Sequence, residues 1–463
     1  MIVTSLLLLI AYYLLVIEGH NIKKDRYVAA KRNRHFSSST DTFSIYDGYT
    51  RKTINNDEKT TQFVMTSFLK NTFLPINYPE SVPKEYTKYQ MFNLIQDLCS
   101  YLRSLMATQS VLKGLGVGRN DITALQATVN WIYRDGAAMI GGLIFTSIAS
   151  GNFGQNIKSY RLFADIINNI GITLDMIAPY FEKHFLLLVC VGNIARALCG
   201  VAAGAVSSSI FEHWGSQNNN IPDVCSKNNA QHTLISLLGL LVSVQFAKYI
   251  NYSPRRLWSI YSILTLIHIY ANVVCMKTLA LRSLNISRYT LIIQNVMKNI
   301  DTIEDYLKST TQLSLKYIAE NEPILRLLLP NNPQIIKNLG KSKYKVKIWC
   351  NPEDLYNIFT ADEIQAAIQR YKHTFNSNYL ILLDHRKKNA YVCFDNKSDK
   401  IDEAKAVLEV AILLDHEYPD ADGCHRLTNK IFPQLFAKLK QLGWDTSKIL
   451  FIPSTNAKTY HLS

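Results

Sequence analysis

The feature that most constrains this chain is a long stretch with very little charge. Residues 136–281 contain nine basic and five acidic side chains among 146 residues, about a tenth, whereas charged residues make up 19% of the whole 463-residue chain. The densest apolar pieces of this stretch are Gly136–Ser150, Phe185–Phe211, Leu234–Phe246 and Leu257–Met276. The second and fourth pieces are long enough to cross a bilayer, and the first and third have the length of buried helices.

Two explanations of these apolar pieces remain open. Helices of a membrane domain would give them, and so would the buried helices of a large soluble bundle. Arg196, His268 and Asn272 interrupt the two longest pieces, and an arginine at mid-bilayer costs about 2.5 to 3.5 kcal/mol. We favour the membrane domain. The net charge of +14 agrees with an anionic membrane surface, and because no nucleic-acid motif accompanies it we expect no nucleic-acid partner.

The patterns typical of enzymes and metal proteins are missing from the sequence. Eight cysteines lie between Cys99 and Cys424 without a C-x-x-C pair, which predicts free thiols and no zinc site. Spacing assembles no metal-ligand set and no nucleophile with a positioned base, so we expect no metal, no cofactor and no catalytic residues. The glycines Gly114, Gly116 and Gly118 favour a turn between two helices, with anion binding by their backbone as the alternative.

The first 60 residues predict an anchor and a linker. An apolar run from Ile2 to Ile17 is followed, between Lys23 and Arg34, by six basic residues and one aspartate. A secretory signal has the opposite order of charge, so we interpret residues 1–19 as a hydrophobic anchor, with a cleaved signal as the alternative. The positive-inside tendency then leaves the following residues in the cytoplasm. Residues 20–60 are polar and basic, as in a solvated linker.

A mainly α fold is expected after the linker. Residues 61–288 predict a helical domain: apolar residues from Phe92 to Met106 recur at spacings of three and four, and Asn120 or Asp121 can cap a second helix. Residues 289–330 predict connecting helices.

The last third of the chain predicts a small α/β domain at residues 331–463. Thr360-Ala-Asp-Glu363 is a capping box. Tyr379–Asp384 and Ala390–Asp395 are typical of strands, Ile401 to Leu414 of a helix, and Ile449–Ile452 of a further strand.

The chain also resembles a known family, the Root UV-B Sensitive (RUS) family, over roughly residues 73–288. The resemblance depends on motifs that occur in the family's order: Phe73-Leu-Pro, Tyr78-Pro-Glu-Ser81, Ala107-Thr-Gln109, Gly114-Leu-Gly-Val-Gly118, Arg134-Asp-Gly136, Arg161-Leu with Ala164-Asp165, Gly200-Val-Ala, Asp223-Val with Lys227, and Leu284-Asn285 with Arg288. It departs from the family at Gly142, Asn169, Ser207 and His232, where the resemblance leads us to expect Arg, Asp, Arg and Glu.

The resemblance implies a membrane-associated eukaryotic protein of no established biochemical activity. Plant members are linked to vitamin B6 (pyridoxal phosphate) homeostasis and the response to ultraviolet-B. It therefore favours a membrane-bound scaffold or regulator whose partners are membrane lipid and a second RUS protein or another copy of the chain. A multi-pass small-molecule transporter is the first alternative. An enzyme centred on His213 is the second.

Several charged residues are candidates for binding a ligand. Arg134 with Asp135 and Arg161 with Asp165 would hold an anionic head group or a phosphate, or form plain ion pairs. Arg196 needs a carboxylate or carbonyl groups as its partner, with Asp165, Asp175 and Asp223 as the candidate carboxylates. The polar loop of His213, Asp223 and Lys227 completes the set. Gly192, Gly200 and Gly204 predict close helix packing, because small residues at spacings of four let helices approach.

Overall fold

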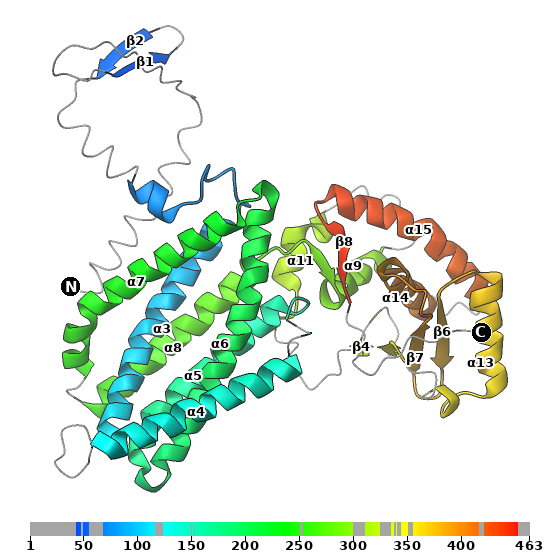
Figure 1. Cartoon of the computed structure of the whole chain (residues 1–463). Helices are drawn as coiled ribbons and strands as arrows, with labels where there is room; N and C mark the ends of the chain where they lie inside the picture. Colours follow the sequence, from blue (N-terminus) through cyan, green and yellow to red (C-terminus); the bar gives the residue numbers. More distant parts are fainter. Residues whose placement is uncertain are drawn as a thin grey trace. The chain divides into compact units, whose positions relative to one another are not determined.

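We describe a computed structural model of the chain (Figure 1). The structure describes residues 43–47, 50–54, 68–115, 124–149, 151, 153–250, 253–299, 311–324, 335–337, 339, 344–350, 355–415 and 421–451. The predicted anchor at residues 1–19, the glycines Gly116 and Gly118, and the predicted caps Asn120 and Asp121 lie outside the described residues. The predicted mainly α fold, with a small C-terminal domain that contains strands, is confirmed.

The chain divides into two compact units, one of residues 1–84 with 214–256 and one of residues 85–213 with 257–463. In the first unit, β1 (Phe43–Asp47) and β2 (Thr50–Ile54) form an antiparallel hairpin. This hairpin falls inside the segment for which composition predicts a linker. Its strands are rich in aromatic and β-branched residues, which favour strands even between polar flanks. The unit also contains a helix at residues 68–73 and α7 (Ile221–Ile250).

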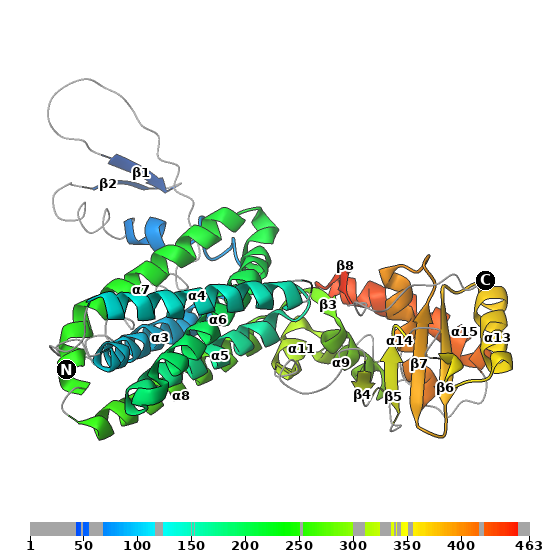
Figure 2. The same ribbon diagram turned by 60° about the horizontal axis from the view of Figure 1, so that its bottom comes forward.

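The second unit begins with long helices. They are α3 (Tyr86–Gly114), α4 (Ala124–Ala149), α5 (Ile157–Ile177), α6 (Phe185–Gly215) and α8 (Pro254–Thr278). Two short turns, η2 (Ala178–Tyr180) and η3 (Glu182–His184), separate α5 from α6. Both views show α3, α5, α6 and α8 running side by side (Figures 1 and 2). We call this bundle, with α4, the helical domain.

Among the described residues, four helical segments are long and apolar enough to cross a membrane by length and composition. They are Ile157–Tyr180, Glu182–Gly215, Ile221–Ile250 and Pro254–Thr278. Two of them, Glu182–Gly215 and Pro254–Thr278, contain the pieces whose length predicts a membrane span. The expectation that Leu234–Phe246 is too short to span is wrong, because α7 begins at Ile221 and its polar first turns hide its length in the sequence. The remaining segment, Ile157–Tyr180, contains α5. The sequence does not single it out, because charged residues near its start lower its apolar content.

The C-terminal domain combines a mixed sheet with helices. Its four strands lie in the order β4 (Ile335–Lys337), β5 (Lys345–Ile348), β7 (Asn389–Phe394) and β6 (Tyr379–Asp384). Only the central pair, β5 and β7, is parallel. The helices are α9 (Ile286–Met297), α11 (Leu315–Asn321), α13 (Ala361–Ile368), α14 (Lys400–Asp415) and α15 (Ala421–Gln441). Two further strands, β3 (Ser283–Asn285) and β8 (Asp445–Leu450), pair in parallel.

The core of this domain reaches further back in the chain than the predicted boundary at residue 331. One cluster of buried side chains extends from Leu284 to Phe451 and includes most of α9. The hydroxyl of Tyr289 donates to the carbonyl of Ala404 in α14 at 2.8 Å. Helix α9, in the segment predicted to connect the domains, is therefore a core element of the C-terminal domain.

Local predictions in this domain agree closely with the structure. The capping box at the start of α13 is confirmed: the backbone N–H of Glu363 donates to Thr360 Oγ1 at 3.3 Å, and the N–H of Thr360 donates to the Glu363 carboxylate at 2.8 Å. The eight cysteines are free, as predicted.

Candidate functional site

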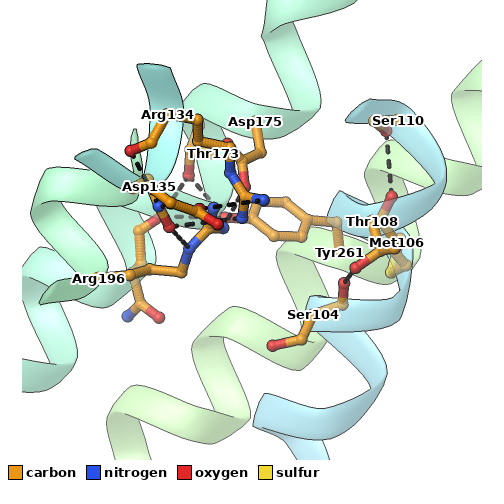
Figure 3. Close-up of polar contacts among 12 residues, drawn as sticks. Ser104, Met106, Thr108, Ser110, Arg134, Asp135, Thr173, Asp175, Arg196 and Tyr261 are labelled. Carbon is orange, nitrogen blue, oxygen red and sulfur yellow. Dashed lines mark hydrogen bonds and ion pairs between the residues drawn. The ribbon is translucent and has the colours of Figure 1, made fainter. Parts of the chain in front are cut away.

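Polar side chains, several of them buried, gather between the helices of the helical domain. One group, which we call the α4–α6 cluster, consists of Arg134, Asp135, Asp175 and Arg196, which Figure 3 labels, together with Asn193. Arg196 forms an ion pair with Asp175, whose side chain is 2% exposed. The amide nitrogen of Asn193 donates to Asp135 Oδ1 at 3.0 Å and to the carbonyl of Arg134 at 3.2 Å. Of the three carboxylates left open by the sequence, Asp175 is thus the partner of Arg196.

The α4–α6 cluster lies where α5 and α6 approach closely. A Cβ atom added to Gly171 would lie 2.6 Å from the carbonyl oxygen of Gly192, and one added to Gly192 would lie 2.9 Å from Asp175 Oδ1. Two glycines therefore let α6 bring Arg196 against Asp175. The sequence also predicts close packing at Gly200 and Gly204, and these two glycines do not take part in the contact with α5. Both are exposed, and an added Cβ would meet no described atom within 4 Å.

The number of residues per helical turn explains why these two glycines do not face α5. A spacing of four residues advances 400° around an α-helix, so a stripe at that spacing drifts by about 40° per step. After two or three steps from Gly192, the stripe has rotated away from the contact with α5. Small residues at that spacing identify where packing begins and do not fix how far it extends.

A second group, which we call the α3–α5 cluster, consists of Gln96, Arg103, Arg161, Asp165 and Asn169. Arg161 and Asp165, one turn apart on α5, form an ion pair of 2.9 Å. The amide of Gln96 donates to the other oxygen of the Asp165 carboxylate. Arg103 donates to the side-chain oxygen of Asn169. The predicted pair Arg161 and Asp165 is therefore part of a larger polar network that crosses from α5 to α3.

The other predicted residues have structural partners. In the first unit, Asp223 Oδ2 accepts from the backbone N–H of Ile76 at 2.8 Å. Lys227 donates to the carbonyl of Asn71 at 2.6 Å and lies 3.4 Å from Asp223. These two residues thus hold residues 71–76 against α7. In the second unit, His213 Nε2 lies 3.6 Å from a carboxylate oxygen of Glu85.

The pKa of Glu85 reflects this contact with His213. Burial raises the pKa of the Glu85 carboxyl, but hydrogen bonding to His213 and its own backbone lowers it, and the net pKa lies below the ordinary value. The described residues contain no group of three or more His, Cys, Asp or Glu side chains able to hold a metal. The geometry favours structural or binding roles for these residues.

A third ionic group, which we call the Glu322 cluster, involves the first turn of α5. The carboxylate of Glu322, 5% exposed, lies 2.9 Å from Lys158 Nζ and 3.1 Å from Arg288 Nε. The amide of Asn285, the N-cap of α9, donates to it at 3.3 Å. Burial alone would raise the pKa of Glu322, but the two cations and their hydrogen bonds more than offset this and lower it to about 2.

Sequence reasoning missed several of these residues. Arg103 was not identified because it lies on the buried face of α3, between apolar residues at helical spacing. Lys158 and Glu322 were missed because 164 positions separate them in the chain. One usable signal existed in α8, where Thr265, His268 and Asn272 repeat at helical spacing within an apolar piece.

Comparison with known proteins identifies the family. Residues 59–300, just over half of the chain, match the model of the vitamin B6 photo-protection and homoeostasis domain. The chain belongs to the RUS family. The resemblance found in the sequence is thereby confirmed. The match includes the α4–α6 cluster, the α3–α5 cluster and α7.

Several RUS proteins are similar to this chain. Protein root UVB sensitive 3 of Arabidopsis thaliana is 27% identical over 389 residues, which cover 82% of this chain and 83% of the relative. RUS family member 1 of Dictyostelium discoideum is 34% identical over 287 residues, which cover 59% of this chain and 54% of the relative. Protein root UVB sensitive 2, chloroplastic, of Arabidopsis thaliana is 31% identical over 254 residues, which cover 54% of this chain and 57% of the relative. None of these names states an enzymatic or transport activity, and no solved structure matches the chain.

Proposed function

We propose that this RUS protein is embedded in a membrane and serves vitamin B6 homeostasis as a scaffold or regulator without catalysing a reaction. The observation that carries the proposal is the apolar surface of its long helices. On α4, Met139 is 70% exposed, Leu143 73% and Ile148 73%. On α8, Leu266 is 68% exposed and Tyr270 64%. Monomeric soluble proteins rarely expose contiguous apolar patches of this kind, whereas lipid chains cover them in a membrane.

The interior of the helical domain supports the same proposal. Charged side chains such as Asp165 and Asp175 lie inside the bundle and face arginines. Membrane helices place ionisable residues in this way, because a charge that faces lipid is costly. Gly200 and Gly204 leave a smooth surface on α6, and small residues of this kind let a second helix approach closely. That surface supports a partner helix from a second RUS protein or from another copy of the chain.

The test of membrane embedding is extraction of the full chain, carrying a C-terminal tag, from isolated cell membranes. We expect the protein to stay in the pellet at alkaline pH in carbonate and to be released by detergent. Protease added to sealed cytoplasm-facing vesicles would remove the tag if the C-terminal domain is cytoplasmic. Release of the chain by carbonate alone would overturn the proposal of an integral membrane protein.

The role in vitamin B6 homeostasis is tested separately. We expect cells that lack the protein to have a changed content of pyridoxal 5′-phosphate, and the intact chain to restore it. An unchanged content would contradict this part of the proposal. In vitro, the purified chain should leave each B6 vitamer chemically unchanged, and turnover of any vitamer would show that it is an enzyme.

A further inference from the structure

Four polar side chains in the middle of the helical domain carry buried atoms without a partner among the described residues. These atoms are Arg103 Nη2, Asn169 Nδ2, His268 Nδ1, and both Nδ2 and Oδ1 of Asn272. The side chains are deeply buried: Arg103 and Asn272 are 0% exposed, His268 1% and Asn169 8%. Because the great majority of buried polar groups in proteins are hydrogen-bonded, so many unpartnered atoms in one place point to a bound molecule.

The charge of this region supports an anion. The guanidinium of Arg103 donates to three neutral oxygens: the carbonyl of Cys99 at 3.3 Å, the Thr265 hydroxyl at 3.5 Å, and the amide oxygen of Asn169. It forms no ion pair with a described carboxylate. The nearby Asp165 attracts this charge, but its carboxylate is already bound to Arg161 and Gln96. A buried cation that has no ion-pair partner of its own is unfavourable.

The unpartnered atoms follow one direction through the bundle. Thr265, His268 and Asn272 share one face of α8 by their spacing, and Ser100 Oγ on α3 lies 3.5 Å from His268 Nε2. Arg103 thus lies opposite Thr265, and His268 follows one turn along α8. Asn272 lies four residues further, or about 6 Å along the helix axis. A single inorganic ion at Arg103 would not span this distance. An elongated organic molecule would span it, and because the atoms that contact it are buried here, its binding requires α3 and α8 to separate.

We propose that this site, which we call the Arg103 site, binds a small organic anion between α3, α5 and α8. Its phosphate group accepts from Arg103 Nη2 and Asn169 Nδ2. Its polar body extends toward His268 and Asn272. An anion at Arg103 does not depend on the proposed function, whereas the choice of a B6 vitamer as the organic anion rests on it.

The experiment measures binding to the full chain, purified in detergent or lipid nanodiscs, by isothermal titration calorimetry. The probes are pyridoxamine 5′-phosphate, pyridoxamine and inorganic phosphate. Pyridoxamine 5′-phosphate lacks an aldehyde, so it forms no imine with lysines. We expect it to bind more tightly than inorganic phosphate, and pyridoxamine to bind at least about tenfold more weakly, as expected for the loss of a charged hydrogen bond.

Two variants and a control make the test specific. Asn169→Asp adds a carboxylate beside Arg103 with almost no change of shape, so it should raise the melting temperature and abolish binding. Asn272→Leu should lower the affinity for pyridoxamine 5′-phosphate about tenfold and leave that for inorganic phosphate unchanged. Arg255→Gln, at an exposed arginine, is the control and should bind as the unaltered chain does.

Three results would overturn the proposal. One is the failure of both phosphate probes to bind the unaltered chain. Another is binding that survives in Asn169→Asp, which would place the anion elsewhere. The third is equal affinity for inorganic phosphate and pyridoxamine 5′-phosphate, which would remove the contact with His268 and Asn272.

Discussion

At the scale of single residues, three buried carboxylates of the second unit each lie beside a cation. Asp165 pairs with Arg161, Asp175 with Arg196, and Glu322 with both Lys158 and Arg288. Breaking a buried pair is costly because it leaves one charge uncompensated, even where the intact pair adds little net stability. These carboxylates therefore make the fold sensitive to single substitutions that change no shape.

The clearest case is Glu322. Its pKa is about 2 in the folded chain, against 4.5 for an ordinary glutamate. Because the folded-state pKa is depressed, the stability that the carboxylate contributes is fully present above pH 4.5. It is lost as the pH falls from 4.5 toward 2, and it amounts to about 3 kcal/mol. We expect Glu322→Gln to lower the free energy of unfolding by a similar amount at pH 7.

Thermal melts of the full chain in detergent at pH 7 and pH 3 measure this effect. At pH 3 the difference between the unaltered chain and Glu322→Gln should shrink. Glu320→Gln, at an exposed glutamate two residues away, is the matched control and should melt as the unaltered chain does. A difference that stays constant with pH would show that the carboxylate of Glu322 is not the source of the stability.

At the scale of helices and strands, the contact between α5 and α6 depends on two glycines. A methyl group on Gly171 would lie 2.6 Å from backbone, which cannot move as a flexible side chain can. We expect Gly171→Ala to separate the two helices and to destabilise the chain by about 1 to 3 kcal/mol. Gly200→Ala places the same group in open space. It should be neutral or stabilise the helix by up to about 1 kcal/mol.

Thermal melts of the two glycine variants side by side measure this difference, since both make the same change within α-helices. Equal effects would show that helix propensity, rather than the contact between α5 and α6, decides the outcome. If Gly171→Ala also weakens the ion pair of Arg196 with Asp175, then Asp175→Asn should destabilise that variant less than it destabilises the unaltered chain.

How much the sequence can predict differs between these elements. Periodicity predicted α3 and α14, and β-rich composition predicted β6, because each signal is local. The start of α7 was missed because polar residues occupy its first turns. Arg196 required a carboxylate, but three candidates fitted equally, since the choice depends on how α5 meets α6. The Arg103 site was not predicted for the same reason, because it exists only where three helices meet.

At the scale of the whole molecule, the extent of the C-terminal domain decides which part of the chain can fold without lipid. Its core includes α9, where Tyr289, Ile292, Ile293 and Val296 are all 0% exposed. Burial of each such side chain is worth about 1.5 to 3 kcal/mol. Four of them together therefore contribute an amount comparable with the whole stability of a domain, about 5 to 15 kcal/mol.

We accordingly expect a fragment of residues 283–463 to fold in buffer without detergent and to unfold cooperatively. A fragment of residues 331–463 lacks α9, and also loses strand β3, which pairs with β8, and the Leu313 carbonyl to which Trp444 Nε1 donates at 2.9 Å. It should be aggregated or unfolded. Circular dichroism and size-exclusion chromatography of the two fragments distinguish these outcomes. Cooperative folding of the shorter fragment would contradict the role of α9, because the core would then close without its four buried side chains.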